Sequence, residues 1–231
     1  MKKYKHIFFD LDNTLWDFER NSTESLNELY QKHKLESLGV ESVERFISTY
    51  QERNIMMWEQ YRLGKIDKNT LRNKRFELTF WDMGLDADLV PKELADDYLS
   101  ITPKKSYLFP HAHEVLSYLQ KKYTLHIITN GFEEAQYIKL DTADLSKYFV
   151  EIVISEHTGF KKPDISIFNH SAERANATAD ECLMVGDGLE VDVIGAQNAG
   201  WDGVFFNPAG IKHDEKVTYE ISSLDELKNF L

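Results

Sequence analysis

Short apolar segments alternate with helical segments through the second half of the chain, and this alternation is the strongest constraint on its fold. Strands are expected over residues 123–129, 152–155, 181–185 and 201–206, and helices over residues 133–142, 164–176, 189–199 and 223–231. Repeated strand–helix units place the strands parallel and cover both faces of their sheet. The sequence therefore predicts an α/β fold with a doubly wound, parallel-sheet, Rossmann-like core.

The first half of the chain has helical periodicity instead. Leu26 and Leu29 are spaced as neighbours on one helix face, and residues 16–102 carry almost no strand signal. Glycines and a proline divide this segment into about four helices. We expect residues 1–15 and 103–231 to form the catalytic core, and the inserted segment to form an α-helical cap domain.

Composition restricts the partners and the location of the protein. The chain has 231 residues and a formal net charge of −12, which disfavours nonspecific binding to nucleic acid but allows a local cationic site for a small anion. No segment approaches the roughly 20 apolar residues of a membrane span, and the first apolar run is too short for a signal peptide. The one cysteine, Cys182, has apolar neighbours and is expected to be a buried structural thiol. We expect a cytoplasmic protein without a nucleic-acid or membrane partner; its oligomeric state is left open.

Two aspartates, Asp10 and Asp12, end the first apolar run, Ile7 to Phe9. Open α/β sheets bind their ligands at the carboxyl ends of the strands. One carboxylate there can act as a nucleophile, and the second can exchange protons with the leaving group. Aspartates at strand ends also serve as turn and helix-entry residues, so the pair alone leaves both interpretations open.

Two later strand ends carry groups that suit a phosphate. Thr129 and Asn130 precede a helix, where a hydroxyl and backbone N–H groups can bind phosphate oxygens. Lys162, placed before the rigid Pro163, can direct an ammonium at developing negative charge, although the adjacent Lys161 leaves the choice of lysine open. Each segment taken singly is also consistent with an ordinary turn or a solvated charge.

A third strand end carries Asp187 between two glycines, which is a common turn sequence. Its carboxylate could instead complete a site for a hard cation with Asp10, because Mg²⁺ prefers one or two carboxylates, water and substrate phosphate. The four polar strand ends are expected on one edge of the parallel sheet. Their joint occurrence favours a catalytic site over four unrelated turns.

These segments resemble the four motifs of the haloacid dehalogenase (HAD) superfamily, whose members are mostly phosphatases. The matching segments are Asp10-Leu11-Asp12-Asn13-Thr14, Thr129, Lys162-Pro163, and Gly186-Asp187 with Asp192. The resemblance covers essentially the whole chain, and the helical insert resembles the α-helical cap of subfamily I. It implies a phosphoric monoester hydrolase on a Rossmann-like fold.

A narrower resemblance is to the branch that contains pyrimidine 5′-nucleotidases. It involves the segments Ile128-Thr129-Asn130-Gly131-Phe132, Ile154-Ser155-Glu156 and Met184-Val185-Gly186-Asp187. One departure from the superfamily pattern is Gly188, where serine or threonine is common. The narrower resemblance implies that the partner is a small phosphorylated metabolite, with a nucleoside 5′-monophosphate as the first choice.

The resemblance also implies roles for the motif residues. Asp10 would attack phosphorus and form an aspartyl-phosphate, while Asp12 would protonate the leaving oxygen and later accept a proton from water. Mg²⁺ would be bound by Asp10, Asp187 and the backbone carbonyl of Asp12. The phosphate would be bound by Thr129, the Asn130 backbone and Lys162. Asp192 would orient Lys162 or a metal-bound water.

Substrate selection is expected to depend on the inserted helices. Residues 62–75 hold six basic side chains and one acid, and Arg75 is our candidate for closing the cap over an anionic substrate, although such a run is also typical of a solvated helix face. Aromatic side chains of the insert could stack on a nucleobase. His111 and His113 are not expected to bind a metal, because residues two apart do not share a helix face.

Other functions remain open. A phosphatase or phosphomutase acting on small sugar phosphates is possible, although such phosphomutases usually carry glycine where Asn13 stands. Dehalogenases of the superfamily lack the second aspartate, so Asp12 favours a leaving group that needs a proton. A non-catalytic phospho-aspartate switch would be about half this length and lack the helical insert. A metal-dependent glycosyltransferase also uses an Asp-x-Asp motif, but that function would not explain Thr129 or Lys162. A binding protein on an inactive enzyme scaffold would not need a suitable residue at every catalytic position.

Overall fold

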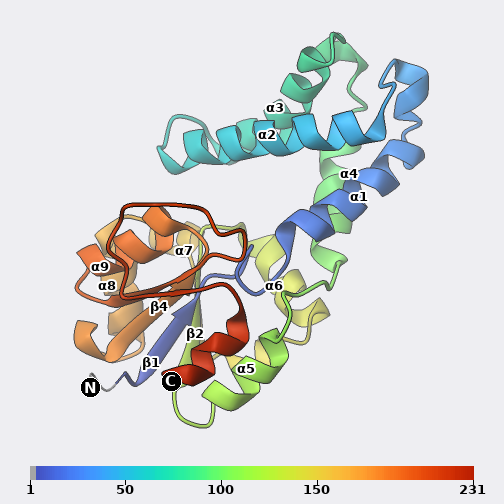
Figure 1. Cartoon of the computed structure of the whole chain (residues 1–231). Coiled ribbons are helices and arrows are strands. Elements are labelled where there is room, and N and C mark those ends of the chain that lie inside the picture. The colour runs from blue at the N-terminus through green and yellow to red at the C-terminus, as the bar shows by residue number, and fades with distance from the viewer. Residues whose placement is uncertain (1–3) are drawn as a thin grey trace. The chain divides into compact units, whose positions relative to one another are not determined.

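The computed structural model describes residues 4–231, so residues 1–3 of the expected core range lie outside the described residues. The chain forms two compact units, one made of the N-terminal segment up to Phe18 together with Ser106–Leu231 and the other of Glu19–Lys105 (Figure 1). The first strand therefore belongs to the same unit as all the later strands. We call these the α/β unit and the helical unit.

The α/β unit is built on a six-stranded sheet in which all the strand pairs are parallel. The strands are β1 (His6–Phe9), β2 (Thr124–Thr129), β3 (Glu151–Ile154), β4 (Cys182–Gly186), β5 (Asp202–Phe206) and β6 (Tyr219–Ile221). Their order is β3-β2-β1-β4-β5-β6, so the chain reverses direction across the sheet between β1 and β4. The predicted α/β, parallel-sheet fold is confirmed, and the crevice beside β1 is where such sheets bind ligands.

Both faces of the sheet are buried, which explains why β1 is a continuous apolar run. Ile7 and Phe9 belong to a core cluster that includes side chains of α5, while Phe8 between them belongs to a second cluster that includes side chains of α8. The helices of this unit are α5 (Ala112–Leu119), α6 (Glu133–Thr142), α7 (Ser155–Thr158), α8 (Ile165–Arg174) and α9 (Gly195–Asn198). 3₁₀ turns cover Ser146–Tyr148, Ala179–Glu181 and Leu224–Asn229.

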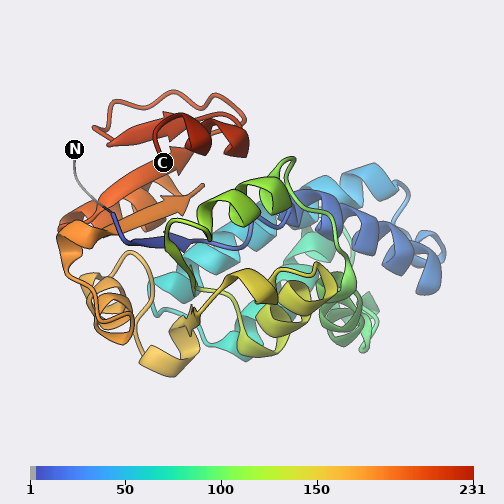
Figure 2. The same ribbon diagram turned by 90° about the horizontal axis from the view of Figure 1, so that it is seen from below.

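The sequence prediction was wrong at three places in this unit, one of which is the expected helix over residues 223–231, where the structure has only the 3₁₀ turn Leu224–Asn229. The segment 201–206 is not the last strand, because the three-residue β6 adds an edge strand that is too short to produce a recognisable pattern (Figure 2). The expected helix over residues 189–199 is divided into a π-helical turn, Leu189–Ile194, and α9. The turn brings Asp192 back to accept a hydrogen bond from the Gly188 N–H at 2.9 Å.

The helical unit contains α1 (Phe18–Lys32, which begins at the end of the α/β unit), α2 (Val43–Arg62), α3 (Lys68–Asp82) and α4 (Leu94–Ile101). 3₁₀ turns cover Leu35–Leu38, Ala87–Leu89 and Thr102–Lys104. Side-chain caps from Ser42 and Asp67 fix the starts of α2 and α3. The predicted periodicity is correct: Leu26 and Leu29 lie in the core of this unit.

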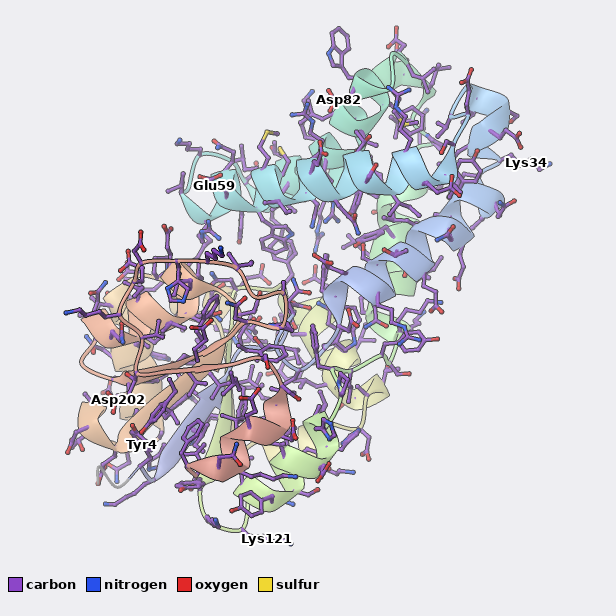
Figure 3. All side chains as sticks on the ribbon, in the orientation of Figure 1. Tyr4, Lys34, Glu59, Asp82, Lys121 and Asp202 are labelled. Atoms are coloured by element: carbon purple, nitrogen blue, oxygen red, sulfur yellow. The ribbon has the colours of Figure 1, made fainter. Side chains whose placement is uncertain are left out.

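Two further features of the α/β unit follow from its packing. Tyr4 donates a hydrogen bond of 2.6 Å to the Asp202 carboxylate, which ties the start of β1 to the start of β5 (Figure 3).

Cys182 is buried, as predicted, and burial raises the pKa of its thiol to about 12. Among residues 4–231, no helix is both long enough and apolar enough to cross a membrane.

A buried histidine in β2 is expected to make the stability of this unit depend on pH. His126 Nε2 lies 3.1 Å from His6 Nδ1, and burial, reinforced by the neighbouring His6, lowers the pKa of His126 from 6.5 to about 4. Between these pH values the unfolded chain binds a proton at this residue that the folded chain does not, so stability falls as the pH falls. We expect this residue to remove about 2 kcal/mol of stability between pH 7 and pH 5.

Urea unfolding at the two pH values measures this loss. His126→Gln keeps a polar side chain but cannot titrate, so the variant should lose about 2 kcal/mol less than the wild type over the same interval. An equal loss in both proteins would show that other groups cause the acid sensitivity.

Candidate active site

The polar residues singled out in the sequence follow the strands of one parallel sheet. Asp10 directly follows β1, Thr129 ends β2, and Asp187 directly follows β4. The strands β2 and β4 pair with β1 on either side. Because the carboxyl ends of parallel strands lie at one edge, three of the four predicted motifs are neighbours by topology alone.

The remaining motif residue, Lys162, lies in the loop between α7 and α8 and not at a strand end as predicted, but its side chain lies at the centre of this group. Its side chain is 2% exposed, and its ammonium contacts Asp10 Oδ1 at 2.5 Å and Asp192 Oδ1 at 2.6 Å. It also donates a 2.8 Å hydrogen bond to the backbone carbonyl of Ile128. Lys162 therefore donates hydrogen bonds to Asp10 and to the Ile128 carbonyl and forms an ion pair with Asp192, so the structure brings this lysine to Asp10.

Asn130 holds the backbone of the lysine in place. Its side-chain Nδ2 donates to the carbonyl of Lys162 at 3.0 Å, and its Oδ1 accepts from the N–H of Lys162 at 2.9 Å. Thr129 is 1% exposed, and its Oγ1 accepts a hydrogen bond from the Gly131 N–H at 3.0 Å. The side chain of Asn130 therefore joins the β2 loop to the Lys162 loop.

Three carboxylates gather around the ammonium. Asp10, Asp187 and Asp192 each place one oxygen within 4.8 Å of the others, an arrangement that could hold a metal ion. Thr14, to which the sequence analysis gave no role, donates to Asp187 Oδ1 at 3.1 Å and accepts from the Asp187 N–H at 3.0 Å. Asp192 joins the cluster through the π-helical turn that brings it back toward β4.

With all three carboxylates ionised, the cluster would hold more negative charge than its one lysine balances. Burial raises the pKa of Asp10 to about 7, with contributions from Asp192, even though Lys162 pulls it down. Burial and the nearby Asp10 and Asp192 raise the pKa of Asp187 well above its usual range. Burial alone would lower the pKa of Lys162, but the two carboxylates that it contacts outweigh burial and raise it. A bound divalent cation would offset the remaining repulsion.

Two glycines leave room for the Asp192 carboxylate. A Cβ on Gly186 would lie 2.4 Å from Asp192 Oδ2, and a Cβ on Gly188 would lie 2.8 Å from the same oxygen. The Gly188 N–H meanwhile donates to that oxygen. In this chain, glycine at position 188, where serine or threonine is common in the superfamily, allows the Asp192 carboxylate to lie close to the backbone.

Asp12 is held by a different set of residues. Its carboxylate accepts hydrogen bonds from Gln136 Nε2 at 2.9 Å and from Lys139 Nζ at 2.6 Å, both on α6. Neither donor was predicted from the sequence. Their spacing of three on a helix that follows the Thr129-Asn130-Gly131 segment was the signal that could have revealed them.

The other candidate residues have contacts of their own. Arg75 is a buried residue of the helical unit, where it donates to Asn54 Oδ1 at 2.9 Å and its guanidinium lies 4.9 Å from the ring centroid of Tyr98. It does not lie on a solvated helix face. His111 pairs with Glu114, and His113 contacts Tyr148, so the two histidines have separate partners.

Comparison with known proteins identifies the family. Residues 4–200 match the family described as haloacid dehalogenase-like hydrolase. The chain is a haloacid dehalogenase-like hydrolase. The predicted membership of the HAD superfamily is thereby confirmed, and the protein is an enzyme of the hydrolase class.

Individual relatives of this HAD-like hydrolase are similar over their whole length. The chain is 31% identical to the pyrimidine 5′-nucleotidase PynA of Streptococcus pneumoniae, with 99% of this chain and 95% of the relative covered. It is 32% identical to the pyrimidine 5′-nucleotidase YjjG of Escherichia coli, with 99% and 98% covered. The crystal structure of the magnesium-bound HAD-hydrolase YfnB from Bacillus subtilis matches with a TM-score of 0.88 and 31% identity, covering 99% of this chain and 98% of that one.

Proposed function

We propose that this HAD-like hydrolase is a Mg²⁺-dependent phosphomonoesterase that forms an aspartyl-phosphate and acts on nucleoside 5′-monophosphates. The single observation that carries the proposal is the contact of the Lys162 ammonium with Asp10 Oδ1 at 2.5 Å, inside a cluster of three carboxylates. This arrangement gives a nucleophile, a fixed cation and oxygen ligands at one edge of the sheet. The presence of Asp12 favours an ester whose leaving oxygen needs a proton.

In the first step, a carboxylate oxygen of Asp10 attacks phosphorus as the bond from phosphorus to the leaving oxygen breaks. Asp12 gives its proton to that oxygen, and the free alcohol departs. Lys162, the Thr129 hydroxyl and the backbone N–H of Asn130 contact the equatorial phosphate oxygens. Asp192 keeps the ammonium aimed at the site through its 2.6 Å contact.

In the second step, water attacks the phosphorus of the aspartyl-phosphate. Asp12, now ionised, takes a proton from the water as the bond between Asp10 and phosphorus breaks. Inorganic phosphate leaves, and Asp10 and Asp12 return to their starting forms. The two steps together consume one water and release one alcohol and one phosphate.

The donor set fits a hard divalent cation. Asp10, Asp187 and the backbone carbonyl of Asp12 are the proposed ligands of Mg²⁺, all of them oxygen donors. When bound, the ion would orient the phosphate and reduce its repulsion from the carboxylates. The relative of known structure, YfnB, is described as magnesium-bound, which supports this choice.

Binding of Mg²⁺ should stabilise the fold. At a hundredfold excess over its Kd, we expect a gain of about 2.7 kcal/mol, or a rise in Tm of roughly 5–10 °C. Asp187→Asn should lose most of this rise because it removes one proposed ligand. The control Asp214→Asn, at an exposed position of the same unit, should keep it. Thermal unfolding with and without Mg²⁺ makes the comparison, and an equal rise in the two variants would contradict the ligand assignment.

The substrate class rests on similarity to two proteins named pyrimidine 5′-nucleotidase. We further propose that the helical unit is a cap and that Arg75 acts in binding an anionic substrate. Burial of its guanidinium among aromatic rings would strengthen its attraction for an anion that reaches it. Phosphatase or phosphomutase activity on small sugar phosphates is the competing function.

The proposed function is tested by phosphate release with Mg²⁺ across nucleoside monophosphates and sugar phosphates. The highest kcat/KM is expected for pyrimidine nucleoside 5′-monophosphates. Release from sugar phosphates alone would keep the chemistry and reject the nucleotidase assignment. No release from any ester would reject the phosphatase assignment itself.

A further inference from the structure

Helix α6 holds the carboxylate of Asp12 by both of its oxygens. Gln136 Nε2 donates to Oδ2 at 2.9 Å, and Lys139 Nζ donates to Oδ1 at 2.6 Å. The two donors are three residues apart, so they lie on one face of the helix. A carboxylate that accepts a hydrogen bond on each oxygen cannot rotate without losing at least one of them.

The two donors are more deeply buried than the group they bind. Gln136 is 1% exposed and Lys139 is 5% exposed, whereas the side chain of Asp12 is 26% exposed. The Lys139 ammonium also lies 4.4 Å from the ring centroid of Trp16 and 5.7 Å from that of Phe18. Burying an ammonium is costly unless it is paired, and here aromatic faces and one carboxylate surround it. Gln136 and Lys139 are therefore held in place by burial, whereas the Asp12 carboxylate that they bind is partly exposed to solvent.

Two features show that the local structure is arranged around these contacts. A Cβ on Gly131 would lie 1.5 Å from Gln136 Nε2, so the turn after β2 leaves the space through which the amide reaches Asp12. Within residues 4–231, the buried Gln136 Oε1 has no hydrogen-bond partner. Leaving a buried acceptor unpaired costs about 1–3 kcal/mol, and the amide nevertheless keeps its N–H directed at Asp12.

We infer that Gln136 and Lys139 are positioning residues that hold Asp12 in the orientation for proton transfer, an inference that rests on the proposed phosphatase function. In this structure the Asp12 carboxylate accepts from both donors. A protonated Asp12 keeps an oxygen that accepts from one donor, while its O–H is directed at the leaving oxygen. Small errors in such an orientation reduce rates strongly, because proton transfer requires hydrogen-bond contact.

The dependence of the rate on the leaving group tests this inference. An alcohol must receive a proton to depart, whereas 4-nitrophenolate departs without one. In kcat/KM, which covers the steps up to departure of the leaving group, Lys139→Met and Gln136→Leu should lose about 10- to 100-fold on the best alkyl phosphate. They should lose less than about threefold on 4-nitrophenyl phosphate, whose leaving group does not need Asp12 as an acid.

Three controls separate positioning from general damage to the fold. Lys139→Arg keeps a charged donor and should recover part of the loss, and Tyr137→Ala, at an exposed position of α6, should change neither ester. In an Asp12→Asn background, Lys139→Met should cause no further loss, because the group it positions is gone. Equal losses on both esters, or additive losses in the double variant, would overturn the inference.

Failure of the proposed function can be told apart from failure of this inference. If Asp12→Asn itself loses equally on both esters, Asp12 is not the acid, and both ideas fall. If Asp12→Asn is selective for the alkyl ester but Lys139→Met and Gln136→Leu are not, the function stands and only the positioning role is wrong.

Discussion

Replacing Asp10 with asparagine is expected to lower kcat/KM for phosphate esters by a factor of about 10⁴ or more, because removing a catalytic nucleophile has effects of this size. The substitution keeps the shape of the side chain but removes the oxygen that forms the aspartyl-phosphate. Lys162 then loses one of its two carboxylate partners, although Asp192 stays within 2.6 Å. Phosphate release under saturating Mg²⁺ measures the loss.

Thermal unfolding of the same variant provides the control, since a folded protein without activity locates the defect in the chemistry. Residual activity within about 100-fold of the wild type would mean that water attacks the substrate directly, and a nucleophilic Asp10 would then be rejected.

Replacing Lys162 with methionine is expected to reduce both activity and stability. The ammonium is enclosed by Asp10, Asp192 and the Ile128 carbonyl, so its loss leaves two buried carboxylates without their counterion. Breaking a buried ion pair in this way costs about 3–5 kcal/mol. Loss of a fixed positive group beside the phosphoryl centre should also lower kcat by about 10²- to 10³-fold.

The adjacent lysine offers a matched control. Lys161→Met removes the same charge from the next residue, and we expect its kcat to stay within about threefold and its stability within about 1 kcal/mol of the wild type. Urea unfolding and phosphate release on both variants complete the test. Equal losses in the two variants would indicate that only net charge near the loop matters.

Much of the candidate site could be predicted because a parallel sheet converts strand ends into neighbours. Asp10, Thr129 and Asp187 each end an apolar run, and those runs pair side by side in the sheet. Local sequence was sufficient to locate these three strands, and topology then placed their ends together. Lys162 was also predicted, although it reaches the site from a loop, because the sequence placed it directly before Pro163.

The contacts that surround the motifs could not be predicted in the same way. The hydrogen bonds of Asp12 to Gln136 and Lys139 join residues more than 120 positions apart through a helix face. Thr14 pairs with Asp187 across a similarly long separation. Such contacts depend on how distant segments pack together; a spacing of three marks residues on one helix face but does not identify the group that this face meets. The burial of Arg75 likewise depends on neighbouring helices of its unit rather than on its own basic segment.

The central claim is that Asp10 becomes phosphorylated, and trapping the intermediate tests it most directly. In Asp12→Asn the base that activates water is missing, so the aspartyl-phosphate should accumulate when the variant is mixed with 4-nitrophenyl phosphate and Mg²⁺. After an acid quench, peptide mass spectrometry should find one phosphoryl group on Asp10, and none when Asp10→Asn is added to the variant. Nitrophenolate release without phosphorylation of Asp10, or a phosphoryl group on another residue, would contradict the account.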